Sequence, residues 1–324
     1  MDKKLAVIIH LMPWELDLFI ELTNQLKRNS TFIDSSNIIF DITLTISDDQ
    51  IDWENSEKNV CKDYTLKKFH EILKKYDWGC EVKTHIIESG SYGCVSARRD
   101  ATERYGDEYI MWLDPDIVFS DLTFSVIIQT INHLKSDLFL ITPQVVKNGD
   151  HTWDVITNEQ FVNEPYGFHK TFDPYGINKF TMENMSDLVV NINPKIKFGG
   201  GWCNTFSGKL LKMLEIPKDV PAYGIEDYYT QEGIKCLKSL GVDVNQYVVQ
   251  NLIVAENHKY WNLTEMNKEC YKLKLTKEKQ RDITDKISAQ VFNELFERLQ
   301  NEHGIGQNVS PHIQSLMGEE KSNF

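Results

Sequence analysis

Residues 109–119 read Tyr109-Ile110-Met111-Trp112-Leu113-Asp114-Pro115-Asp116-Ile117-Val118-Phe119, an apolar run interrupted by two carboxylates with one residue between them. The hydrophobic residues on both flanks predict a buried strand, and such a strand does not end in two acids unless something neutralises them. Residues i and i+2 of an extended segment point the same way, so Asp114 and Asp116 can converge on one cation or polar ligand. The pattern predicts a divalent metal ion that carries phosphates.

The tripeptide Asp114-Pro115-Asp116 also has a plain alternative. Asp and Pro both favour turns, and Pro lacks the N–H that a strand ladder needs. Taken alone, the motif is equally consistent with a turn. The rest of the chain has to decide between the two interpretations.

Strand-like and helix-like segments alternate along the first 120 residues. Short apolar runs predict strands, and patterns with helical spacing predict helices between them. This alternation predicts an α/β fold with a largely parallel sheet. Ligands of such sheets bind beyond the carboxyl ends of the strands, where the two acids would lie. The predicted strands cover residues 5–10, 38–46, 80–87 and 109–113, and the helices cover 14–27, 66–76 and 95–104.

Composition indicates an ordinary globular chain. The 324 residues are 41% hydrophobic and 26% charged, with a formal net charge of −13 that argues against broad adhesion to nucleic acid or anionic lipid. The six cysteines are scattered without a Cys-x-x-Cys pair, and the chain begins without a signal peptide, so we expect a cytoplasmic protein. We expect no transmembrane segment, because no stretch approaches about 18 apolar residues.

A glycine-containing segment and a helix precede the acid pair. Residues 90–101 read Gly-Ser-Tyr-Gly-Cys-Val-Ser-Ala-Arg-Arg-Asp-Ala, followed by the apolar strand and Asp114-Pro115-Asp116. This order resembles the Gly-x-x-x-Ala-Arg-Asn helix and the DxD motif of GT-A fold nucleotide-sugar glycosyltransferases, particularly family-2-like enzymes. The chain has Arg99-Asp100 where Arg-Asn is more usual. Arg98 and Arg99 are candidate nucleotide contacts because Arg binds phosphate through two hydrogen bonds, although either could instead pair with nearby acids.

The resemblance continues past the middle of the chain, in residues 198–207, which read Phe-Gly-Gly-Gly-Trp-Cys-Asn-Thr-Phe-Ser. Glycines such as Gly200 and Gly201 permit close approach of backbone to a ligand, and Trp202 can stack on a sugar face. The resemblance implies that these three residues bind the nucleotide sugar. The alternative is a glycine-rich loop with a Trp in the core.

A second acidic pair lies in residues 222–229, Ala-Tyr-Gly-Ile-Glu-Asp-Tyr-Tyr. It resembles the pair that opens an acceptor-facing helix in GT-A enzymes, where a carboxylate can take the proton of an attacking hydroxyl. The resemblance implies catalytic roles for Asp227 and Glu226, with Asp227 ranked first. The same acids could serve only to complement the dipole of a helix N-terminus.

A histidine follows the apolar run at residues 248–254. In several metal-dependent GT-A groups a His in this place completes the coordination that the DxD motif begins, so the resemblance implies His258 as a metal ligand. A lone His is more often an ordinary core or surface group. The implied metal is Mn²⁺ or Mg²⁺, held by Asp116 and His258, with Asp114 contacting the ribose or the water shell of the metal.

The implied activity is metal-dependent transfer of a hexose or pentose from a nucleotide-diphosphate sugar, a UDP-sugar first, to an acceptor hydroxyl. The acceptor would be a glycan or polysaccharide, and the alternative is a hydroxylated base of phage-type DNA. Inverting and retaining chemistry both remain open. A nucleotidyltransferase ranks lower, because His10-Leu11-Met12-Pro13-Trp14 replaces a glycine-rich phosphate loop after the first strand. A non-catalytic sugar-binding homologue also ranks lower, because both acid pairs are intact.

We predict two regions: a GT-A domain with a mixed, mostly parallel, Rossmann-like sheet at residues 1–262, and a helical C-terminal extension at 263–324. The aromatic segment 151–172 could contact the acceptor or form a structured insertion. Residues 303–324 are expected to be a mobile end. The oligomeric state is open.

An apolar stripe at helical spacing predicts a helix that packs on the catalytic domain, rather than on a second copy or a membrane, through Ile283, Ile287, Val291, Phe292, Leu295, Phe296 and Leu299.

Overall fold

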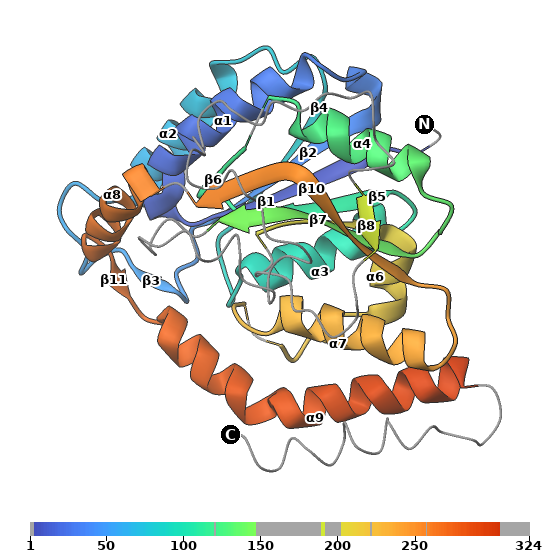
Figure 1. Ribbon diagram of the computed structural model, residues 1–324. Coiled ribbons are helices and arrows are strands. Elements are labelled where there is room, and N and C mark those ends of the chain that lie inside the picture. Colours follow the sequence, from blue (N-terminus) through green and yellow to red (C-terminus); the bar gives the residue numbers. More distant parts are fainter. Residues whose placement is uncertain are drawn as a thin grey trace.

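The computed structural model describes residues 3–119, 121–146, 189–191, 202–220, 222–256 and 258–304, which form a sheet with helices on both faces (Figure 1). The segment 151–172 and most of the expected mobile end lie outside the described residues. The strands are β1 (Leu5–Leu11), β2 (Ile38–Thr45), β3 (Ile51–Asp52), β4 (Glu81–Ile87), β5 (Tyr109–Leu113), β6 (Ile117–Val118), β7 (Phe139–Val146), β8 (Val189–Asn191), β9 (Cys203–Ser207), β10 (Asn245–Glu256) and β11 (Lys272–Leu273).

Helices fill most of the connections between these strands. Two short 3₁₀ helices, Pro13–Glu15 and Ser35–Asn37, precede α1 and β2. The α-helices are α1 (Leu16–Ser30), α2 (Lys62–Lys74), α3 (Cys94–Tyr105), α4 (Thr123–His133), α6 (Gly208–Leu214), α7 (Glu226–Ser239), α8 (His258–Glu269) and α9 (Lys277–His303). The elements predicted from the sequence up to residue 113 are all present, with ends that differ by a few residues.

The main sheet is mixed and mostly parallel, as predicted. Among the described residues it has nine strands in the order β4-β2-β1-β5-β9-β7-β10-β6, with β8 beside β10. Neighbours from β4 to β5 run parallel, whereas β9 is antiparallel to both β5 and β7. Because β2, β1 and β5 are parallel, their carboxyl ends meet at one edge of the sheet, and the acids that follow Leu113 lie there.

The apolar runs form strands because both faces of the sheet are covered. Along β1, Val7 and Ile9 pack against the layer of α1, α2 and α4, while Ala6 and Ile8 pack against the layer of α3, α6 and α7 (Figure 1). Successive side chains of a strand point to opposite faces, so a strand that is buried on both sides has to be apolar throughout. This explains why the strand patterns in the sequence are continuous rather than alternating.

The predicted C-terminal stripe packs on the body of the protein through most of its length. Helix α9 runs along α7 on the side away from the sheet (Figure 1). Val291, Leu295 and Leu299 are buried in the same cluster as α7 residues such as Ile234. Ile283, which the stripe also included, is 45% exposed. The contact with α7 therefore begins after the first turns of α9.

Leu295 offers a test of this packing. Its side chain is 1% exposed, so Leu295→Ala leaves a cavity between α7 and α9 and is expected to lower the free energy of unfolding by about 2–5 kcal/mol. Ile283→Ala on the exposed side is expected to change it by less than about 0.5 kcal/mol. Urea denaturation of the two variants makes the comparison. Equal effects would show that α9 does not pack as described.

The C-terminal region is tied to the sheet domain at several points. The predicted domain boundary at residue 262 falls inside α8, and β11 pairs with β3 through Lys272 opposite Asp52 and Leu273 opposite Ile51.

All six cysteines lie in the described residues as free thiols. No helix among the described residues is both long enough and apolar enough to cross a bilayer.

Candidate active site

The acid pair lies between two strands that fix its backbone. Strand β5 ends at Leu113, and the N–H of Asp114 donates to the carbonyl of Trp202 at 2.9 Å, next to the antiparallel strand β9. Strand β6 begins at Ile117 and pairs with the end of β10, where Ile117 lies opposite Glu256. The segment that holds the two carboxylates is therefore anchored on both sides.

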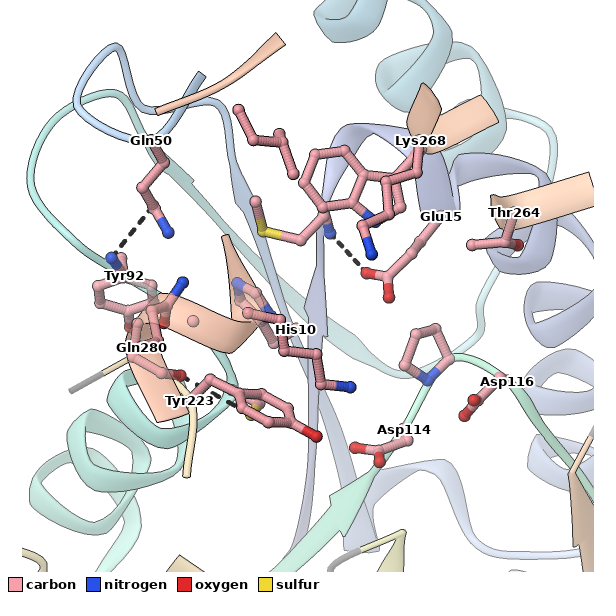
Figure 2. Close-up of a pocket in the computed structure, with 18 of the residues that line it drawn as sticks. His10, Glu15, Gln50, Tyr92, Asp114, Asp116, Tyr223, Thr264, Lys268 and Gln280 are labelled. Carbon is pink, nitrogen blue, oxygen red and sulfur yellow. Dashed lines mark hydrogen bonds between the residues drawn. The ribbon is translucent and has the colours of Figure 1, made fainter. Parts of the chain in front are cut away.

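Asp114 and Asp116 line a pocket of about 220 Å³ at the carboxyl ends of the strands (Figure 2). Its walls come from the residues after β1 and β2, the start of α3, the segment before α7, and the C-terminal region. Both acids are half-buried. The labelled lining residues are His10, Glu15, Gln50, Tyr92, Asp114, Asp116, Tyr223, Thr264, Lys268 and Gln280.

Arg98 joins the two acidic motifs that the sequence singled out. Its Nη2 donates to Asp114 Oδ1 at 2.6 Å, and its Nη1 donates to Glu226 Oε1. The guanidinium also lies over the ring of Trp112, 4.9 Å from the ring centroid. Arg98 is 5% exposed and does not line the pocket. In this arrangement its guanidinium holds Asp114 in place and compensates its charge.

The second acidic pair opens α7, and its two members differ in accessibility. Glu226 is 4% exposed, and its Oε2 has no hydrogen-bond partner among the described residues. Burial raises the pKa of Glu226 to about 7, although the nearby Arg98 acts in the opposite direction. Asp227 is half-buried and accepts a hydrogen bond from the N–H of Tyr228 at 2.7 Å. Asp227 is therefore the more accessible of the two carboxylates.

Close backbone packing holds the start of α7 beside the pocket. The N–H of Val95, in the first turn of α3, donates to the carbonyl of Ala222 at 3.2 Å. A Cβ on Gly93 would lie 2.3 Å from that carbonyl oxygen, so only glycine allows this approach. The glycine segment before α3 thus positions the second acidic pair as well as one wall of the pocket.

The other residues predicted for the site lie in different places. Arg99 does not line this pocket; its Nη1 donates to the carbonyl of Pro217 at 3.3 Å, beside a second cavity between α3, α6 and α9. The ring of Trp202 is half-buried against the core. His258 is the first residue of α8, two positions after the β10 residue that pairs with Ile117. Gly200 and Gly201 lie outside the described residues.

Comparison with known proteins identifies the architecture. No protein-family model matches the sequence, and no curated protein matches it. The crystal structure of S. aureus TarS matches with a TM-score of 0.50 at 15% identity, over 92% of this chain and 43% of that chain. The matching structures have the GT-A fold. This chain has the GT-A fold.

Two further GT-A structures are less similar. The crystal structure of S. aureus TarS 1-349 has a TM-score of 0.49 at 15% identity, over 96% of this chain and 77% of that chain. Glucosyl-3-phosphoglycerate synthase from Mycobacterium tuberculosis, in complex with Mn²⁺, UDP and glucosyl-3-phosphoglycerate, has a TM-score of 0.39 at 12% identity, over 94% of this chain and 82% of that chain. At sequence identities this low, the similarity shows the fold alone.

The donor atoms at the acid pair fit one kind of metal site in this GT-A chain. Carboxylate oxygens suit Mg²⁺ and Mn²⁺, and a metal that carries phosphates needs only one or two protein carboxylates. No three described His, Cys, Asp or Glu side chains gather at one point as a metal-binding group. By residue type, Asp114 and Asp116 could hold such a cation, and Asp114 is also paired with Arg98.

Several residues that line the pocket were not predicted from the sequence. Glu15 follows β1 by four residues, and the rule that ligands bind at carboxyl ends of parallel strands would have pointed to it. Thr264, Lys277 and Gln280 come from the C-terminal region. No local pattern marks these three residues, because contacts between distant parts of the chain, such as the pairing of β11 with β3, bring them to the pocket.

Glu15 predicts a specific pH dependence. Burial raises its pKa from an ordinary value near 4.5 to about 7, against the hydrogen bond from the N–H of Met12, which lowers it. A carboxyl whose pKa is raised in the folded state stabilises the fold fully below pH 4.5, and this stabilisation is lost as the pH rises through about 7. The difference in free energy of unfolding between the wild type and Glu15→Gln should therefore change by about 2 kcal/mol between pH 5 and pH 8, with the wild type less stable at pH 8.

Urea denaturation of both proteins at the two pH values measures this difference. Glu269→Gln, at an exposed position on α8, is the control and should follow the wild type. A constant difference between the wild type and Glu15→Gln over this range would show that Glu15 does not titrate there.

Proposed function

We propose that this protein is a metal-dependent glycosyltransferase that moves a sugar from a nucleotide-diphosphate sugar to an acceptor hydroxyl. One observation carries the proposal: Arg98 connects Asp114, at the wall of the pocket, to Glu226, at the start of α7. A donor-binding acid and the second acidic pair are thereby held in one rigid arrangement. The GT-A fold supports the proposal, because it places this pocket at the carboxyl ends of β1, β2 and β5.

In the proposed reaction the pocket binds the donor, and Asp114 and Asp116 hold Mn²⁺ or Mg²⁺, with His258 as a further candidate ligand. A bound divalent cation would neutralise charge on the diphosphate leaving group. Trp202 and the neighbouring Gly200 and Gly201 remain candidates for contacts with the sugar. Arg99 points to another cavity, so we do not include it among the donor contacts.

The accessible carboxylate of Asp227 is the proposed general base for inversion. The acceptor oxygen would form a bond to the anomeric carbon, the bond from that carbon to the diphosphate oxygen would break, and the hydroxyl proton would pass to Asp227. Glu226, paired with Arg98, would position this region. With retention of configuration, the acid pair would only orient the substrates.

The proposed acceptor is a glycan or polysaccharide hydroxyl. A hydroxylated base in DNA is the second candidate, and the formal net charge of −13 disfavours it, because DNA-binding surfaces attract phosphates through Lys and Arg. UDP-sugars are the proposed donors. UDP-GlcNAc, with which S. aureus TarS 1-349 has been crystallised, is a practical first probe.

Release of nucleoside diphosphate tests the activity. The protein is incubated with UDP-, GDP-, CDP- and dTDP-sugars and Mn²⁺, with glycan acceptors and with DNA that contains hydroxymethylated bases. We expect release from one donor class, and Asp227→Asn should lower turnover about 100-fold or more while the donor still binds. If no donor releases nucleoside diphosphate with any of the acceptors, the proposal is contradicted.

A further inference from the structure

The C-terminal region forms one wall of the donor pocket and is anchored there. The N–H of Lys274 donates to the carbonyl of Gln50 at 2.8 Å, and its Nζ donates to the carbonyl of Asp48 at 2.8 Å. Further along, Thr284 Oγ1 donates to the carbonyl of Tyr223 at 3.1 Å. Residues 274–284 are thus attached at one end to the loop after β2 and at the other to the segment before α7. The first turn of α9, between these two attachments, lines the pocket.

Two buried polar side chains in this wall have unused hydrogen-bonding groups. Thr264 is 8% exposed and Gln280 is 7% exposed, and both line the pocket (Figure 2). Thr264 Oγ1 and Gln280 Oε1 have no partner among the described residues. A buried polar atom without a hydrogen-bond partner is unfavourable, so such atoms beside a pocket indicate a polar ligand.

Lys277 brings a positive charge to the same place. It lines the pocket together with Asp114, and its Nζ lies 4.1 Å from the centroid of the Tyr223 ring. Lys268, the other lysine of the pocket, is 3.7 Å from Glu265 and so already has an acidic neighbour. No carboxylate of the described residues lies within ion-pair distance of Lys277, although Glu15 and Asp114 of the same pocket interact with its charge. An ammonium group held beside the donor site is suited to phosphate oxygens.

We propose that Lys277 binds the diphosphate of the donor, so that the C-terminal region supplies a donor ligand in the same pocket as the acid pair. The inference rests on the proposed function, because it assigns a residue to the same pocket. Lys277 should therefore strengthen the binding of a nucleoside diphosphate and have no effect on the binding of the nucleoside alone. The ring of Tyr223 holds the ammonium group at the pocket.

The test compares affinities for nucleoside diphosphates and for the matching nucleosides by isothermal titration calorimetry with Mg²⁺. UDP and uridine are the first pair, followed by the GDP, CDP and dTDP pairs. Lys277→Met should weaken binding of the preferred diphosphate about 10- to 100-fold and leave binding of its nucleoside unchanged. Lys277→Arg should retain most of the affinity. Lys279→Met, an exposed lysine two residues further in the same helical turn, is the matched control and should bind as the wild type does.

The outcomes separate this inference from the proposed function. Wild-type affinity for the diphosphate in Lys277→Met would overturn the role of Lys277 and leave the glycosyltransferase proposal intact. Equal weakening for diphosphate and nucleoside would also overturn it, since a contact with phosphate cannot affect the nucleoside. If the wild type binds none of the diphosphates, both proposals fail. Circular dichroism and thermal unfolding of each variant verify that the fold is retained.

Discussion

Asp116→Asn is expected to reduce sugar transfer about 100- to 1000-fold without a large change in stability. Asp116 lines the pocket, is half-buried and belongs to the short segment between β5 and β6. Asparagine keeps the size and one oxygen of the side chain but removes its negative charge. A carboxylate that holds a divalent cation would lose most of its affinity for the ion on this change.

Two measurements check this prediction. Initial rates of nucleoside diphosphate release are taken over a range of Mn²⁺ concentrations, and urea denaturation gives the free energy of unfolding. Asp121→Asn is the control, because Asp121 is an exposed acid, 44% exposed in its side chain, that pairs with Arg28 at 2.7 Å near the protein surface. It should retain full activity. Wild-type activity and metal dependence in Asp116→Asn would show that Asp116 does not hold the ion.

Arg98→Met is expected to destabilise the fold by about 3–5 kcal/mol. The substitution replaces the guanidinium with an apolar side chain. Among the described residues it removes every ion pair of two acids, the half-buried Asp114 and the buried Glu226. A buried carboxylate without a compensating charge has to be desolvated alone or take up a proton. The cost should therefore be larger at pH 8 than at pH 5, because a protonated Glu226 no longer needs a cation.

A second substitution separates charge compensation from packing. Glu226→Gln in the Arg98→Met background should restore part of the lost stability, since one of the two uncompensated acids is gone. Arg28→Met, which breaks an exposed pair with Asp121, should cost less than about 0.5 kcal/mol. Urea denaturation at the two pH values provides the data. A loss below about 1 kcal/mol for Arg98→Met would show that this arginine does not stabilise the acids.

The parts of the fold that local patterns determine could be predicted from the sequence. Strand β1 is apolar because both its faces are buried, and the position of Asp114 follows from the end of β5. The stripe on α9 has helical spacing and does pack on α7, but the spacing could not show that Ile283 lies beyond the contact. Periodicity shows which face of a helix is apolar and does not show where its partner ends.

The interactions of the site depend on contacts between distant parts of the chain. The sequence suggested Arg98 as a phosphate contact. In the structure its guanidinium instead pairs with two carboxylates, Asp114, 16 residues away, and Glu226, 128 residues away. An arginine that binds a carboxylate and one that binds a phosphate look the same in a sequence, because the guanidinium suits both. The wall of the pocket that contains Lys277 could not be predicted from the sequence either. Only tertiary contacts between distant segments bring Lys277 to the pocket.

Calorimetric titration of the wild type and Asp116→Asn with nucleotide-sugars, in Mn²⁺ and in EDTA, tests most directly whether this pocket binds a nucleotide-sugar donor through its acid pair. We predict that one nucleotide class binds to the wild type with Mn²⁺, and that the affinity falls sharply both in EDTA and in Asp116→Asn. Binding of equal strength in all four combinations of protein and buffer, or no binding of any donor to the wild type, would contradict this account.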